Sequence, residues 1–117
     1  MADYRAGQIV IADWRGALPR EANKLRPAVV IQDDALFDPT YPNIILVPLT
    51  EDSGLAIPDL AVMIEPTPEN WCAQRCYAVA PFVTATSAAR LRPTQSAVTP
   101  EQLARIRQQV AYAIGIG

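Results

Sequence analysis

Short apolar runs rich in β-branched residues alternate with polar turns along most of this chain. Four such runs span Gln8–Trp14, Ala28–Gln32, Asn43–Leu49 and Leu60–Glu65. Each run has the length and residue types of a β-strand, and no helical repeat separates one from the next. The pattern therefore predicts a mainly β protein of antiparallel strands joined by turns, as in a small antiparallel barrel or sandwich.

Prolines divide the apolar runs at two places. Pro48 has no N–H for a strand ladder, so we expect that end of its run at a sheet edge, a bulge or the strand's exit. Pro81 falls between Cys76–Ala80 and Phe82–Thr86, which predicts a fifth strand that is broken or bulged. After the second run, Asp33–Phe37 is expected to form one helical turn, ended by turn-forming residues.

The last part of the chain carries its one clear helical pattern. Thr99 is a suitable N-cap, Pro100 suits the first helical position, and Gln102 completes a capping box. Gly115 is expected to end the helix. An apolar stripe at helical spacing lies between these signals, formed by Leu103, Ile106, Val110 and Ile114. The stripe predicts a C-terminal α-helix that packs on the barrel.

Composition limits the size and class of the protein. The 117 residues suffice for one domain with a buried core, and we assign residues 1–117 to a single domain. Half of the residues are apolar and the net charge is −2, as in an ordinary globular protein. A mildly acidic body does not favour wholesale binding of nucleic acid or membrane, so any anion site must be a local patch.

Histidine is absent, which removes the commonest general base and the commonest metal ligand. Cys72 and Cys76 are the only cysteines, and no second pair completes a zinc site, so we expect neither a metal nor a cofactor. Both cysteines are expected to be buried. We recognise no signal peptide and no apolar run long enough to span a membrane, which predicts a cytoplasmic protein with reduced thiols.

Basic residues gather between the first two apolar runs. Four of the chain's ten Lys and Arg residues lie there: Arg15, Arg20, Lys24 and Arg26. Pro27 biases Arg26 toward an extended backbone, which places its guanidinium where the second strand begins. The loop is either an ordinary solvated surface or a local site for an anion.

Arg26, Thr50 and Glu21 are the residues that could act on a phosphodiester. Arg26 offers planar, bidentate donors, Thr50 offers a hydroxyl at a strand end, and Glu21 offers a proton acceptor. A base for the 2′-hydroxyl proton and cations for the charge on phosphorus would suffice for metal-free RNA cleavage. A surface ion pair between Glu21 and Arg26, worth about 0–1 kcal/mol, is the plainer alternative.

The order of these pieces resembles the MazF/PemK/Kid toxins of bacterial toxin–antitoxin pairs. Gly7 followed by Gln8–Val10 is similar to their opening "G-D/Q-I-V" strand. Glu21 together with Arg26–Ile31 matches their "E-Q-x-G-x-R-P-x-V-V" segment in spacing and residue type, and Val47–Thr50 matches "V-x-P-L/I-T". Residues 103–115 look like their last helix and its "x-L-G" stop.

The resemblance implies an SH3-like barrel with a C-terminal helix, usually a homodimer. It implies a sequence-specific, metal-independent endoribonuclease that cleaves single-stranded mRNA and is inhibited by a cognate antitoxin. Carried over by position, Arg26 stabilises the phosphate and Thr50 holds the substrate or takes part in catalysis. Glu21 would act as acid or base, or would orient Arg26. Other basic residues are candidates for RNA binding: Arg15, Arg20, Lys24 and Arg75.

Several positions depart from the family pattern. Pro19-Arg20 replaces a Gly-Ser pair, and Lys24 replaces the glycine before Arg-Pro. Pro81 stands where some members have a catalytic aspartate, and Val79 stands where some have an arginine. The missing carboxylate implies another base, an altered cleavage site or a catalytically inactive member.

Two non-catalytic functions stay open beside the ribonuclease. The same barrel resembles the gyrase poison CcdB, which binds a topoisomerase; the C-terminal helix would then be the contact. A degenerate MazF-fold protein would keep dimerisation and antitoxin or RNA binding without cleavage. Pro81 favours these two functions, whereas Glu21, Arg26-Pro27 and Thr50 favour the enzyme. Trp14 and Trp71 could stack on bases, although packing in the core or a dimer interface is the commoner use of tryptophan.

Overall fold

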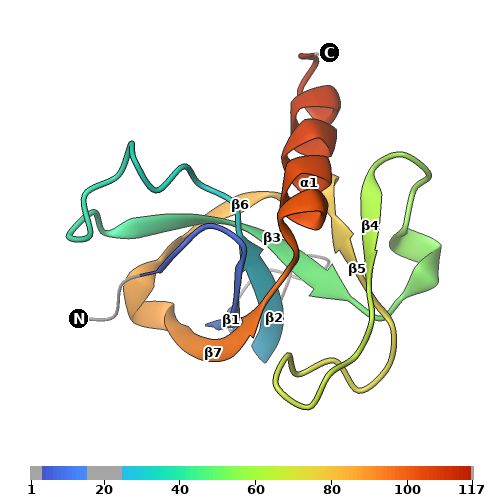
Figure 1. Ribbon diagram of the computed structural model, residues 1–117, viewed down its shortest axis with the longest axis horizontal. Coiled ribbons are helices and arrows are strands. Elements are labelled where there is room, and N and C mark those ends of the chain that lie inside the picture. Colours follow the sequence, from blue (N-terminus) through green and yellow to red (C-terminus); the bar gives the residue numbers. More distant parts are fainter. Residues whose placement is uncertain (1–3, 16–24, 117) are drawn as a thin grey trace.

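The computed structural model describes residues 4–15 and 25–116, which form one curved antiparallel sheet and a C-terminal helix (Figure 1). The strands are β1 (Gln8–Asp13), β2 (Leu25–Val30), β3 (Asn43–Thr50), β4 (Ala61–Ile64), β5 (Cys76–Val79), β6 (Thr84–Ser87) and β7 (Leu91–Ala97), and the helix is α1 (Pro100–Ala113). The strand order is β4-β5-β3-β2-β1-β7, with β6 also paired to β3. The mainly β fold with a C-terminal helix is thus confirmed.

β3 pairs with β2 on one side and with two different strands, β6 and β5, on the other. Its first half pairs with β6 from Asn43 to Leu46, and its last two residues, Leu49 and Thr50, pair with β5. Pro48 lies in the gap between these two ladders, where its missing N–H leaves no β5 or β6 carbonyl without a donor. The sequence-based expectation was a sheet edge, a bulge or the strand's exit; Pro48 instead lies within β3, paired with Ala28 of β2, at the point where the partner on the other side changes from β6 to β5.

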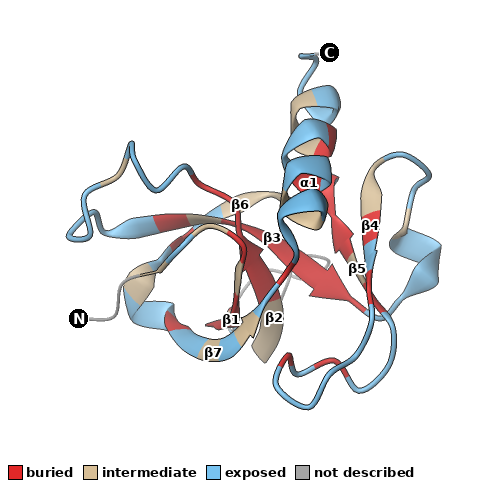
Figure 2. Ribbon diagram, viewed as in Figure 1, coloured by how far each residue is buried: buried red, intermediate tan, exposed pale blue. Residues whose placement is uncertain are grey.

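Both faces of the central strands are buried (Figure 2), because the curved sheet closes over one cluster and carries another on its opposite face. Along β1, Ile9 belongs to one apolar cluster and Val10 to the other, and β2 and β3 alternate in the same way. Trp14 lies in the second cluster, where its indole N–H donates to the Thr86 hydroxyl at 3.0 Å. Burial on both faces explains why these strands are almost continuously apolar.

Helix α1 begins and ends where the sequence predicts. Thr99 and Gln102 form the reciprocal capping box, and Gly115 has a φ of 92°, the left-handed conformation that ends many helices. Ile106 is fully buried against the sheet, whereas Ile114 is 63 % exposed, so the apolar stripe packs only along its first part. Arg107 donates to the main-chain carbonyls just after β2, at 2.9 and 3.0 Å, and fixes the helix there.

Two elements differ from the sequence-based expectations. Asp33–Phe37 forms a hydrogen-bonded turn, with Leu36 N–H donating to the Asp33 carbonyl, and no helix. β7 was not predicted, because it is polar, mostly exposed and contains Pro93. The break at Pro81 is confirmed: a 3-10 turn, Ala80–Phe82, separates β5 from β6. Within the described ranges, no helix is long and apolar enough to cross a membrane.

Candidate active site

The pairing of β2 with β3 brings Arg26 and Thr50 together. Ala28 lies opposite Pro48 in the antiparallel register, and the same register continued by two residues sets Arg26 opposite Thr50. Opposite residues of an antiparallel pair project from the same face of the sheet. Both side chains accordingly line one cleft of about 500 Å³ at this end of the sheet. The two residues selected from the sequence therefore share a site.

Thr50 is held rigidly at the floor of this cleft. Only 7 % of the residue is exposed, and it pairs with Tyr77 of β5 on the side away from β2. Its hydroxyl oxygen accepts a hydrogen bond from the Asp52 N–H at 3.2 Å. Because that contact uses the oxygen as acceptor, the hydroxyl proton can be donated to a ligand in the cleft.

Two carboxylates follow Thr50 and line the same cleft, and sequence reasoning assigned them no catalytic role. Glu51 accepts from the Gln74 N–H at 3.1 Å, and Asp52 caps the 3-10 turn Ser53–Leu55 by accepting from the Gly54 N–H at 2.8 Å. Their positions directly after Thr50 in the sequence could have indicated that they belong to the same site. Among the described lining residues, Arg26 is the one cation beside these two acids.

Trp71 and Cys76 form another part of the cleft wall. Trp71 is 56 % exposed and has a φ of 64°, the left-handed region that large side chains rarely occupy. Cys72 and Cys76 are buried and free, as predicted. Burial raises the pKa of both thiols, and the neighbouring Cys72 sulfur raises the pKa of Cys76 further. Both are therefore neutral at physiological pH.

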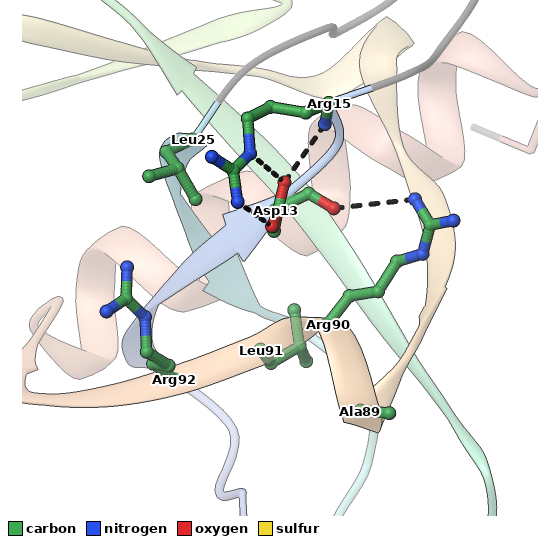
Figure 3. A pocket seen from close by; sticks show the side chains of 7 residues that line it. All are labelled: Asp13, Arg15, Leu25, Ala89, Arg90, Leu91 and Arg92. Atoms are coloured by element: carbon green, nitrogen blue, oxygen red, sulfur yellow. Dashed lines mark hydrogen bonds and ion pairs between the residues drawn. The ribbon is translucent and has the colours of Figure 1, made fainter.

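A second cleft, of about 530 Å³, adjoins the first and is shown in Figure 3. Leu25 lines both clefts, and three arginines line the second: Arg15, Arg90 and Arg92. Arg15 binds Asp13 through two side-chain hydrogen bonds of 2.9 and 2.7 Å, which lower the pKa of Asp13 to about 2. Arg90 donates to the Asp13 carbonyl at 3.5 Å. Arg92 lies over the Trp71 ring, 5.9 Å from its centroid.

The remaining predicted residues lie elsewhere. Arg75 forms an ion pair with Glu65 at 3.0 Å, and it lines neither cleft. Its role in RNA binding stays a prediction. Glu21, Arg20 and Lys24 lie outside the described residues. Sequence reasoning did not find Arg92, because it belongs to the strand that the pattern missed.

In the part of the chain that the structure describes, no group of three His, Cys, Asp or Glu side chains is placed to hold an ion. The described lining of the first cleft offers a guanidinium from Arg26, a hydroxyl from Thr50 and the carboxylates of Glu51 and Asp52.

Comparison with known proteins defines the class to which this fold and site belong. The family model described as PemK-like, MazF-like toxin of type II toxin–antitoxin system matches residues 5–114. The chain is therefore a member of this family of toxins. No curated protein matches the sequence.

Solved structures of similar fold agree with this assignment. A MazF from Deinococcus radiodurans superposes with a TM-score of 0.75 at 19 % identity, covering 99 % of this chain and 100 % of that one. An endoribonuclease from a mycobacterial species, in complex with its cognate antitoxin, gives 0.72 at 18 % identity, covering 96 % and 95 %. The Mycobacterium tuberculosis toxin MazF-mt6 gives 0.71 at 15 % identity, covering 94 % and 98 %. Because each of these structures is less than 20 % identical to this chain, the similarity shows a shared fold.

Proposed function

We propose that this toxin is a metal-independent, sequence-specific endoribonuclease that cleaves single-stranded mRNA. The observation that carries the proposal is the register that sets Arg26 opposite Thr50 in one cleft. A guanidinium beside a rigid hydroxyl donor, on the rim of a sheet open to solvent, suits a phosphodiester in an extended strand. The mycobacterial endoribonuclease of the same fold supports this chemistry.

In the proposed reaction the ribose 2′-oxygen attacks phosphorus while the bond from phosphorus to the 5′-oxygen breaks. A base takes the 2′-hydroxyl proton, and an acid returns a proton to the leaving 5′-oxygen. Arg26 donates to the non-bridging oxygens and stabilises the charge that develops on phosphorus, and Thr50 donates to the same group or holds the ribose. Glu21 is proposed as the acid or base, or as the partner of Arg26. The products are a 2′,3′-cyclic phosphate and a 5′-hydroxyl.

We further propose a homodimer in the cytoplasm that is inhibited by a cognate antitoxin. The complexes of MazF with MazE from Deinococcus radiodurans and of the mycobacterial endoribonuclease with its antitoxin support the second partner. For the RNA, Arg15, Arg20, Lys24 and Arg75 remain the proposed backbone contacts. Arg15 and Arg75 would have to exchange their present carboxylate partners for phosphate.

The test uses purified protein, a long single-stranded RNA and EDTA, with the ends of the products mapped. The wild type is expected to cut at a defined sequence. Arg26→Ala should abolish the cuts, and Thr50→Val, which keeps the β-branched shape but removes the hydroxyl, should slow them by about 10²-fold or more. Arg105→Ala, an exposed arginine of α1 outside both clefts, is the matched control. A folded wild type that leaves the RNA intact would contradict the proposal.

A binding-only member of the fold is the second candidate. Glu51 and Asp52 favour it, because two carboxylates beside Thr50 oppose the approach of phosphate. Pro81 in place of the family's aspartate favours it as well. If no RNA is cut, growth inhibition that survives Arg26→Ala but not removal of residues 114–117 would indicate a gyrase-type poison. A wild type that does not inhibit growth but still binds antitoxin or RNA would indicate a degenerate toxin.

A further inference from the structure

We propose that Trp71 is a base-stacking residue, which binds the unpaired nucleobase next to the phosphodiester held by Arg26 and Thr50. The inference rests on the proposed function for its ligand, a single-stranded RNA. It adds a specificity-determining contact to the pair Arg26 and Thr50, which the motifs selected.

The position of Trp71 is the first observation. The indole lines the cleft that holds Arg26 and Thr50, yet 56 % of the residue is exposed. The other tryptophan, Trp14, is 8 % exposed and has its N–H bonded to Thr86. Trp71 therefore contributes little to the core, and more than half of the residue is exposed at the site of the proposed chemistry. Aromatic rings in such positions bind the faces of unpaired bases.

The backbone that presents Trp71 is the second observation. Its φ of 64° is unfavourable for a bulky side chain, so the surrounding loop must hold it there. Asn70, 1 % exposed, provides that support: its side-chain oxygen accepts from the N–H groups of Thr67 and Cys72 at 3.1 and 3.0 Å. Its amide donates to the Glu65 carbonyl at 3.0 Å. Three hydrogen bonds from the buried Asn70 side chain thus fix the backbone on both sides of Trp71, which favours the preorganisation that a ligand platform requires.

The neighbour of Trp71 is the third observation. The guanidinium of Arg92 lies over the indole at 5.9 Å from the ring centroid, so the ring is held by a cation at the border between the two clefts. Arg92 and Arg90 both line the second cleft (Figure 3). An RNA strand that places its scissile phosphate at Arg26 and a base on Trp71 would then bring its next phosphates toward these arginines. This arrangement of a cationic track with one ring is typical of single-strand recognition.

Binding is measured with fluorescein-labelled fragments that together cover the long test RNA and carry 2′-O-methyl groups in place of the 2′-hydroxyls, so that the probe cannot be cut and needs no mapped cut sequence. Trp71→Ala is expected to weaken binding by about 5- to 100-fold, while Trp71→Phe, which keeps a ring, should retain most of the affinity. The slope of affinity against salt should stay unchanged in both variants, whereas Arg92→Gln should reduce it by about 0.7. Tyr41→Ala, at an exposed aromatic residue that lines neither cleft, is the matched control.

Tryptophan fluorescence gives an independent readout. RNA should quench the wild-type emission, and Trp71→Phe, in which Trp14 is the only tryptophan left, should lose that quench. Unchanged affinity in Trp71→Ala, or a quench that persists in Trp71→Phe, would overturn the inference. So would a change of oligomeric state in Trp71→Phe, which would show that the ring packs against a second copy of the chain.

These outcomes separate the inference from the proposed function. Normal RNA binding and cutting by Trp71→Ala, with cutting lost in Arg26→Ala, would overturn the stacking role alone. RNA binding that depends on Trp71 without any cutting would overturn the endoribonuclease alone. A wild type that neither binds nor cuts single-stranded RNA would overturn both.

Discussion

Three arginines near the clefts differ in whether their guanidinium group is already paired with a carboxylate. Arg15 is bound through two hydrogen bonds to Asp13, and Arg75 is paired with Glu65. Arg92 instead faces the ring of Trp71. Since a paired guanidinium must give up its carboxylate before it binds phosphate, Arg92 is better prepared for an anion than Arg15. The sequence shows only that all three are arginines.

The first prediction concerns Asp13. Arg15→Gln should raise the pKa of Asp13 from about 2 toward its ordinary value, because the side-chain hydrogen bonds from Arg15 are the largest cause of its shift. The folded-state pKa lies below the unfolded one, so this carboxylate favours the folded state above pH 3.8 and loses that effect as the pH falls through about 2. An NMR titration of the carboxyl carbon in both proteins measures the change. An unshifted Asp13 in Arg15→Gln would contradict the pairing.

The second prediction concerns Asn70. Asn70→Ala should lower the free energy of unfolding by about 2–4 kcal/mol, because it leaves the buried N–H of Cys72 and the partly buried N–H of Thr67 without an acceptor. It should also release Trp71, so its emission should shift toward that of a freely solvated indole. Urea unfolding and fluorescence measure the two effects. Asn43→Ala, at an exposed position of β3, is the control; equal stability of the two variants would refute the support from Asn70.

At the scale of elements, the apolar pattern specified the strands that are buried and missed the one that is not. β1, β2 and β3 were found within a few residues because both of their faces are covered. β7 pairs with β1 but is largely solvent-exposed and carries Pro93, so its residues have neither an apolar run nor a clean alternation. The helix was located with its cap because capping is a local interaction that four residues encode.

The third prediction separates the two ends of the helix stripe. Ile106→Ala should destabilise the protein by about 2–5 kcal/mol, because Ile106 is fully buried between α1 and the sheet. Ile114→Ala, the matched change one stripe position beyond Val110, should alter stability by less than about 0.5 kcal/mol, since Ile114 is 63 % exposed. Thermal unfolding of both variants provides the measurement. Comparable losses in the two would mean that Ile114 is covered in solution.

At the scale of the whole molecule, the candidate site arises from pairing between strands that are distant in sequence. The motifs selected Arg26 and Thr50, but only the register of β2 with β3 shows that they face each other. Trp71 joins them from the connection between β4 and β5, whose second strand pairs with the end of β3, and Arg92 joins them from β7, which pairs with β1. No local pattern encodes these contacts, so the sequence could predict the pair and could not predict the cleft around it.

The charges of the whole molecule set the last prediction. The body is mildly acidic, and Glu51 and Asp52 line the same cleft as Arg26. Glu51→Gln should therefore raise the affinity for the uncleavable RNA by about three- to fivefold at low salt, because it removes a like charge near the phosphate. The gain should shrink at high salt, where screening weakens the repulsion. Fluorescence anisotropy at several salt concentrations tests this, with Glu101→Gln on the exposed start of α1 as control.

The cleavage rate of Glu51→Gln at saturating RNA distinguishes repulsion from catalysis. If Glu51 only repels phosphate, that rate should match the wild type while the affinity rises. A rate about 10²-fold lower or more, with affinity unchanged, would instead make Glu51 the proton acceptor. Pro81 would then be tolerated because the strand end beside Thr50 supplies the carboxylate that is missing at position 81.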